Sequence, residues 1–113
     1  MGLTASWCGN ISVLLSPPNS IGASEPILNF GTDEQKKRIL PLLARGAISA
    51  FALTEKEAGS DPSRVKTSAT RMYENGKLIG YRLNGDKLWT TCAIKADGVF
   101  LADYIIVVAR IFD

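Results

Sequence analysis

The spacing of the apolar residues changes near residue 47, and this change constrains the fold more than any other feature of the sequence. Before it, apolar residues recur every three to four positions, as on one face of a helix. After it, apolar and polar residues alternate, and Asn75-Gly76 provides a tight hairpin turn. The order predicts an α+β fold: a helical segment followed by an antiparallel β domain.

Three helices are expected in the first part. One covers residues 3–16 and ends at Pro17-Pro18, and a second covers residues 20–30. A third begins at Thr32, where Thr-Asp-Glu-Gln matches a capping box. Pro41 is expected to kink or restart this helix, and Gly46 to end it.

Five strands are expected in the second part, at residues 49–53, 65–73, 78–83, 86–91 and 104–111. The last of these is almost continuously apolar, which is typical of a strand buried on both faces. The segments therefore divide the 113 residues into a helical part at residues 1–47 and a β part at residues 48–113.

The composition excludes several classes of chemistry. The chain contains no histidine, so neither a Ser-His-Asp triad nor a His-ligated metal can be built from it. Its two cysteines, Cys8 and Cys92, form no CxxC pair, and we expect no metal site. A net charge of +2 argues against nucleic acid as a partner. No apolar run is long enough for a membrane span, and no secretory signal is visible.

Two short motifs carry the functional signal. The first runs from Phe51 through Ala-Leu-Thr-Glu to Gly59-Ser60-Asp61, and the second is Lys87-Leu88-Trp89-Thr90-Thr91. Taken singly, each has an ordinary interpretation as a strand end and a turn, or as a half-buried aromatic in a strand. Together they suggest a flat polar ring held by backbone amides, hydroxyls and one aromatic side chain.

In its motifs the chain resembles the acyl-CoA dehydrogenases, from about residue 19 to residue 110. Phe30-Gly-Thr-Asp-Glu-Gln-Lys36 and Leu40-Pro-Leu-Leu-Ala-Arg-Gly46 resemble the helix that leads into the flavin domain of that family. The resemblance implies that residues 1–47 end an N-terminal helical domain and residues 48–113 begin the middle flavin-binding β-barrel. It also implies the cofactor FAD.

The resemblance assigns roles to individual residues. Residues 51–54 would contact the pyrimidine side of the flavin, Trp89 would pack on the ring face away from substrate, and Thr91 would bond near N5. Ser60 would touch the coenzyme A end of the acyl thioester, and Ile21 would line the acyl cavity. The implied FAD-binding residues are Phe51, Ala52, Leu53, Thr54, Gly59, Ser60, Trp89, Thr90 and Thr91, and the implied substrate-binding residues are Ser60 and Ile21.

The resemblance further implies an enzyme of fatty acid β-oxidation that converts fatty acyl-CoA to trans-2-enoyl-CoA. It would pass electrons to an electron-transferring flavoprotein, assemble as a homo-oligomer at full length, and work in the bacterial cytoplasm or the mitochondrial matrix. The family's catalytic glutamate lies in a C-terminal domain, so no catalytic residue is assigned here, and the chain alone is expected to be inactive. Glu55 and Glu57 are interpreted as solvated charges.

The chain departs from the family pattern at two positions near the motifs. Lys56 stands where proline is usual, and Cys92 stands where asparagine is usual. Three alternatives stay open on the sequence: an acyl-CoA oxidase, a non-catalytic family member or remnant that binds flavin, nucleic acid or another partner, and a small α+β interaction module.

Overall fold

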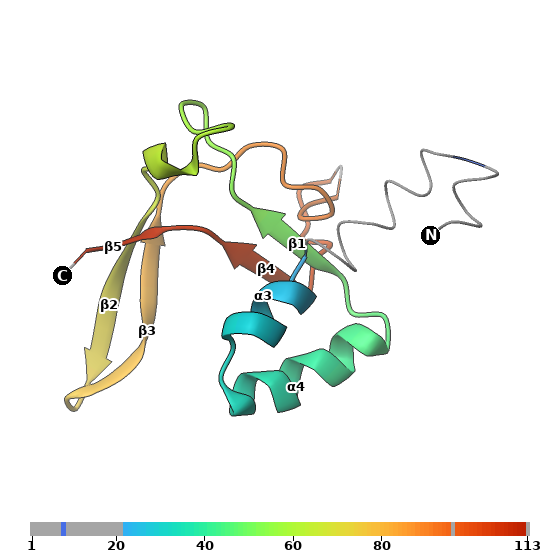
Figure 1. Ribbon diagram of the computed structural model, residues 1–113, viewed down its shortest axis with the longest axis horizontal. Helices are drawn as coiled ribbons and strands as arrows, with labels where there is room; N and C mark the ends of the chain where they lie inside the picture. The colour runs from blue at the N-terminus through green and yellow to red at the C-terminus, as the bar shows by residue number, and fades with distance from the viewer. Residues whose placement is uncertain (1–7, 9–21, 96, 113) are drawn as a thin grey trace. The chain divides into compact units, whose positions relative to one another are not determined.

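The computed structural model describes residue 8, residues 22–95 and residues 97–112 (Figure 1). Two compact units make up the chain: Met1–Phe51 with Thr91–Ile106, and Ala52–Thr90 with Val107–Asp113. Of the predicted helix at residues 3–16 only Cys8 is described; the rest of it and the predicted substrate contact Ile21 lie outside the described residues. The domain boundary expected between residues 47 and 48 stays a prediction.

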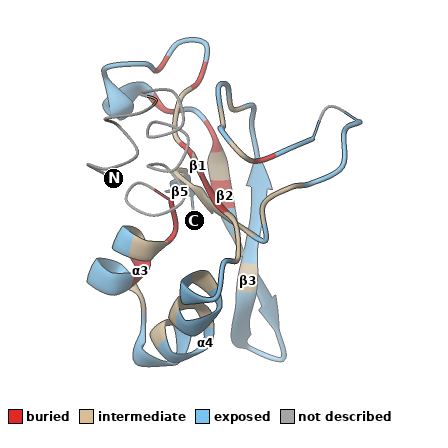
Figure 2. Ribbon diagram, turned by 90° about the vertical axis from the view of Figure 1, so that its right-hand side faces the viewer, coloured by how far each residue is buried: buried red, intermediate tan, exposed pale blue. Residues whose placement is uncertain are grey.

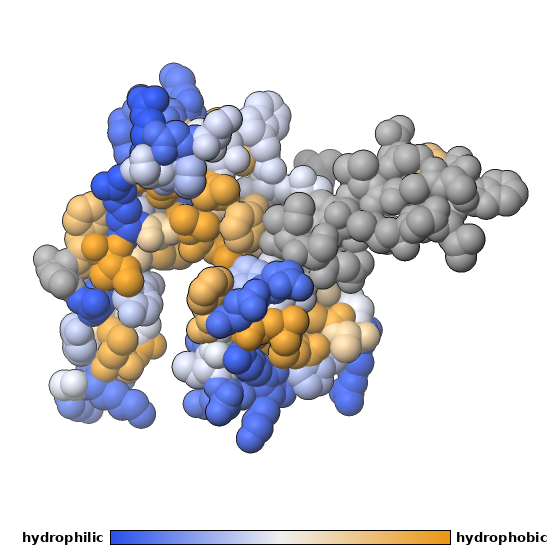
Figure 3. Space-filling model, viewed as in Figure 1, coloured by the Kyte–Doolittle hydropathy of each residue, from blue (hydrophilic) through white to orange (hydrophobic). Residues whose placement is uncertain are grey.

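The first unit contains helices α3 (Ser24–Phe30) and α4 (Asp33–Ala44). The predicted capping box is confirmed: the Gln35 amide donates to Thr32 Oγ1 at 3.2 Å, and the Thr32 amide donates to Gln35 Oε1 at 2.9 Å. Each bond satisfies an amide that the first helical turn leaves without a partner. Apolar side chains remain visible on the surface over these helices (Figure 3), and Phe30 is 89% exposed.

Of the two outcomes predicted for Pro41, a kink or a restart of the helix, the structure contradicts the restart. Pro41 lies inside a single helix that continues to Ala44. Pro41 has no amide hydrogen to donate within the helix, but only three helical residues follow it. Backbone hydrogen bonds from residues beyond Ala44 hold the end of the helix. The Gly46 amide donates to the Leu43 carbonyl at 3.1 Å, with φ +103 at Gly46, so the predicted end at this glycine is confirmed.

The strands form two small sheets. β1 (Ser49–Ala52) pairs with β4 (Tyr104–Val107). β2 (Ser68–Glu74), β3 (Lys77–Asn84) and β5 (Arg110–Phe112) form a sheet of order β3-β2-β5. The hairpin between β2 and β3 is confirmed, with φ +50 at Asn75 and +75 at Gly76, as a primed turn requires.

Four predictions about the β part need correction. The strand expected at residues 104–111 is divided into β4 and β5, which belong to different sheets. Since β5 pairs parallel with β2, the sheet is mixed and the β part is not purely antiparallel. Residues 86–91 form no strand, because Trp89 has φ +59, which interrupts an extended backbone. The strand expected from residue 65 begins at Ser68, after the 3₁₀ turn η2 (Pro62–Arg64).

Small residues make up most of the buried positions, and many of these lie in β1 and in the stretch from residue 55 to the first residues of β2 (Figure 2). Ala50, Ala52, Ala58 and Ala69 are each at most 6% exposed. Two polar residues, Glu55 and Thr67, are buried as well, which is costly unless their polar atoms are bonded. Within the described residues, no helix is long and apolar enough to cross a membrane.

Candidate functional site

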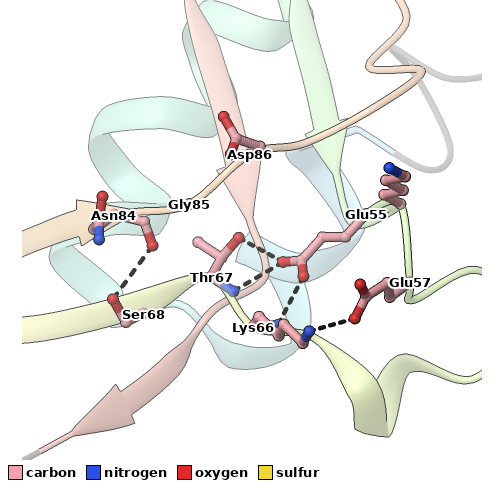
Figure 4. A pocket seen from close by; sticks show the side chains of 9 residues that line it. Glu55, Glu57, Lys66, Thr67, Ser68, Asn84, Gly85 and Asp86 are labelled. Carbon is pink, nitrogen blue, oxygen red and sulfur yellow. Dashed lines mark hydrogen bonds and ion pairs between the residues drawn. The ribbon is translucent and has the colours of Figure 1, made fainter.

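The carboxylate of Glu55 is the centre of the most highly organised polar cluster in the second unit. Glu55 follows β1 and opens a turn in which its amide donates to the Ala58 carbonyl at 3.0 Å and its carbonyl accepts from the Ala58 amide at 3.2 Å. This turn directs the side chain toward the chain that precedes β2 (Figure 4). There, the Lys66 amide donates to Oε2 at 2.7 Å, and the Thr67 amide donates to Oε1 at 2.9 Å.

Two side chains complete the set of four donors. The Thr67 hydroxyl donates to Oε1 at 2.5 Å, and Lys87 Nζ donates to the same oxygen at 2.8 Å. The Lys87 and Glu55 side chains are only 10% and 9% exposed, so this ion pair is shielded from water. Lys87, followed by Thr67 and the Lys66 amide, holds the pKa of Glu55 far below its ordinary value.

Glu55 was expected to be a solvated charge, and the structure shows that this is wrong. The sequence contained one signal for an ion pair between the motifs: Glu55 directly follows an apolar strand, and Lys87 lies inside the second motif. Glu57 behaves as expected. It is exposed and paired with Lys66, whose ammonium lowers the pKa of the Glu57 carboxyl.

The Glu55–Lys87 pair also connects the two predicted flavin-binding motifs. Lys87 Nζ donates to the Leu53 carbonyl at 3.0 Å as well as to Glu55. The next residue, Leu88, donates its amide to the Thr54 carbonyl at 2.8 Å. Residues 53–55 of the first motif therefore lie beside residues 87–88 of the second, although more than thirty residues separate them in the sequence.

At Gly85 the backbone passes close to Thr67, and this close approach permits the arrangement. A Cβ at this position would lie 2.5 Å from Thr67 Oγ1 and 2.7 Å from Thr67 Cα, and the backbone has φ +152. Only glycine fits both requirements without strain. The chain leaving β3 can thus pass over Thr67 on its way to Lys87.

The predicted FAD-binding residues differ in exposure. Ala52 is buried, Phe51, Leu53, Thr54 and Thr90 are half-buried, and Gly59, Ser60, Trp89 and Thr91 are exposed. Trp89 is 86% exposed and has a left-handed backbone, which is rare for a bulky residue. Such strain often accompanies a functional site.

A pocket of about 280 Å³ adjoins the cluster and contains none of the predicted FAD-binding residues (Figure 4). Its lining is polar and carries both charges: Glu55, Lys56, Glu57, Lys66, Thr67, Ser68, Asn84, Gly85 and Asp86. Because Glu55 is held by four donors and its pKa is lowered, it is a poor proton acceptor. No group of three or more His, Cys, Asp or Glu side chains in the described part of the chain could hold a metal ion.

Comparison with known proteins gives consistent matches. Residues 3–47 match the sequence profile of the acyl-CoA dehydrogenase N-terminal domain. A probable acyl-CoA dehydrogenase of Mycobacterium tuberculosis, FadE10, is 48% identical over 102 residues, which are 90% of this chain and 14% of the relative. An acyl-CoA dehydrogenase of Bacillus subtilis is 44% identical over 88 residues, covering 77% of this chain and 22% of the relative.

A solved structure extends the likeness to the fold. The crystal structure of an acyl-CoA dehydrogenase from Bacillus anthracis in complex with FAD matches with a TM-score of 0.72 and 41% sequence identity. The match covers 88% of this chain and 16% of that one. The chain thus spans a small part of the length of the proteins that it matches.

Proposed function

From the premise that this chain belongs to the acyl-CoA dehydrogenase family, we propose that it forms part of the flavin-binding and thioester-binding wall of an FAD-dependent enzyme. The whole enzyme would oxidise fatty acyl-CoA to trans-2-enoyl-CoA and pass electrons to an electron-transferring flavoprotein. We further propose that it acts as a homo-oligomer in the bacterial cytoplasm or the mitochondrial matrix.

The observation that carries the proposal is the contact between the two motifs. Their implied roles require residues 51–54 and residues 89–91 to serve one ring, and the bonds from Lys87 and Leu88 to the carbonyls of Leu53 and Thr54 support this. The FAD complex of the Bacillus anthracis relative, at 41% identity, supports the choice of cofactor.

The residues of this chain fit a flavin in the groups they offer. Trp89 presents an exposed aromatic surface, and Thr54 and Thr90 carry hydroxyls at half-buried positions. The carbonyls of Leu53 and Thr54 each accept a hydrogen bond already. Amide and hydroxyl donors are therefore the main groups left for the acceptor-rich pyrimidine edge of the ring.

The chemistry would be divided between cofactor and protein. A bound flavin supplies the acceptor for the hydride that leaves the β-carbon of the substrate. This chain would orient the ring through residues 51–54, Trp89 and Thr91, and would place Ser60 by the coenzyme A end of the acyl thioester. The proton acceptor is assigned to no residue here, which agrees with the engagement of Glu55 by four donors.

The test uses the uninterrupted reading frame that contains this sequence. We expect the purified product to contain FAD and to oxidise acyl-CoA with an artificial electron acceptor without producing hydrogen peroxide. Trp89→Ala should lower FAD content, whereas Tyr73→Ala, which removes an exposed aromatic from β2, should not. Peroxide formation would favour an oxidase, and a product without FAD would overturn the proposal.

A further inference from the structure

We propose that Glu55 is a positioning residue for the flavin: with Lys87 it forms an ion-pair clamp that fixes residues 53–54 against residues 88–89. This inference rests on the proposed function, because the two segments so fixed are those expected to contact the ring. Glu55 and Lys87 would hold these two segments in place, and neither residue is assigned to touch the flavin.

The clamp is made of three contacts between the same two segments. Lys87 Nζ lies 2.8 Å from Glu55 Oε1 and 3.0 Å from the Leu53 carbonyl, and the Leu88 amide lies 2.8 Å from the Thr54 carbonyl. Two of these three bonds belong to one ammonium group that is almost removed from water. Charge-assisted bonds of this kind are stronger than neutral ones, so Lys87 fixes the separation of the segments.

Glu55 is the fixed end of the clamp. Its carboxylate is held by the amides of Lys66 and Thr67 and by the Thr67 hydroxyl, independently of Lys87. The ammonium therefore meets a carboxylate whose position is already set. Without that carboxylate, Lys87 would retain a buried charge with one carbonyl as its partner, which is strongly unfavourable.

The clamp would affect the flavin by fixing the position of Trp89, which is proposed to pack on the ring. Its left-handed backbone, with φ +59, is costly and persists only when the surrounding structure determines it. Leu88, immediately before it, is bonded to the Thr54 carbonyl, and Lys87, one residue further back, is held by Glu55. The clamp therefore determines where an otherwise exposed indole ring is presented.

The chain offers a matched control for the charge. Glu57 lies two residues from Glu55 and is also paired with a lysine, but the Glu57 and Lys66 side chains are 54% and 72% exposed. Exposed pairs of this kind contribute little. Glu57→Gln thus makes the same change of charge in the same loop without touching the clamp.

The experiment compares Glu55→Gln, Lys87→Met, the double variant E55Q/K87M and Glu57→Gln in the full-length protein. For each, FAD is titrated into the apoprotein, the visible spectrum and reduction potential of the bound flavin are recorded, and unfolding is followed without FAD. We expect each single clamp variant to weaken FAD binding by about tenfold or more, as loss of one charge-assisted bond would. Glu57→Gln should match the wild type.

The double variant separates positioning from stability. It leaves no unpaired buried charge, so its unfolding should return toward that of the wild type. Its flavin spectrum and potential should stay shifted, because the fixed separation is lost. If the wild type binds FAD and the double variant has the wild-type affinity, spectrum and potential, the clamp inference is overturned while the proposed function stands. If the wild type binds no FAD, both fail.

Discussion

Replacing Gly85 by alanine tests the geometry that allows the two motifs to meet. The added Cβ would lie 2.5, 2.7 and 2.9 Å from Oγ1, Cα and Cβ of Thr67. Favourable packing distances between carbon atoms are about 3.5–4.0 Å, so Thr67 and residue 85 must separate by roughly 1 Å. Thr67 supplies two of the four donors to Glu55, and this shift would weaken both bonds.

The expected cost follows from two effects. Forcing extra volume into a packed position costs about 1–3 kcal/mol. A backbone with φ +152 is unfavourable for an L-residue by about 1–3 kcal/mol. Alanine also lowers the conformational entropy of the unfolded chain, which offsets about 0.4–1 kcal/mol of this cost. We therefore expect Gly85→Ala to reduce the free energy of unfolding by about 1–6 kcal/mol, against about 5–15 kcal/mol for the whole stability of an ordinary domain.

Urea unfolding of the intact protein, followed by circular dichroism, measures this cost. Gly80→Ala is the matched control, because Gly80 lies within β3 and nothing stands within 4 Å of its Cβ position. That variant should stay within about 1 kcal/mol of the wild type. A Gly85→Ala protein as stable as Gly80→Ala would refute the close approach to Thr67, and with it the path of the chain toward Lys87.

Three further predictions follow from single contacts. Thr32→Ala removes the capping box of α4 and should cost about 0.5–2 kcal/mol in urea unfolding, whereas an unchanged midpoint would argue against the cap. Cys92→Asn should stabilise the protein by up to about 1 kcal/mol, because Cys92 has φ +64 and asparagine tolerates this conformation better; a loss of stability would contradict that reasoning. Because the pKa of Glu55 is lowered on folding from its ordinary 4.5, the unfolded state binds more protons, so stability should fall as the pH drops below about 4.5, and Glu55→Gln should flatten this dependence.

Local signals in the sequence predicted the elements that depend on near neighbours. The α4 cap needs only Thr32 and Gln35, and the β2–β3 hairpin needs only the Asn75-Gly76 turn, so both could be predicted. The division of residues 104–111 into two strands could not be predicted. It depends on pairing with β1 and β2, which lie far away in the sequence.

The same limit applies to the site. The residue types of the two motifs indicated that they act together, but the partner of each charge did not appear in either motif alone. Glu55 is buried because Lys66, Thr67 and Lys87 satisfy its carboxylate, and these donors come from two other segments. A charge looks solvated in a sequence until its distant partners are known.

Anaerobic titration of the full-length protein with a fatty acyl-CoA tests the central claim most directly. If this chain forms part of the flavin and thioester site of an acyl-CoA dehydrogenase, the protein should carry FAD, and the absorption of the oxidised flavin should bleach as substrate is added. A protein that contains FAD whose spectrum does not respond to any acyl-CoA would contradict the assigned reaction. A protein that takes up no FAD at all would contradict the assigned site.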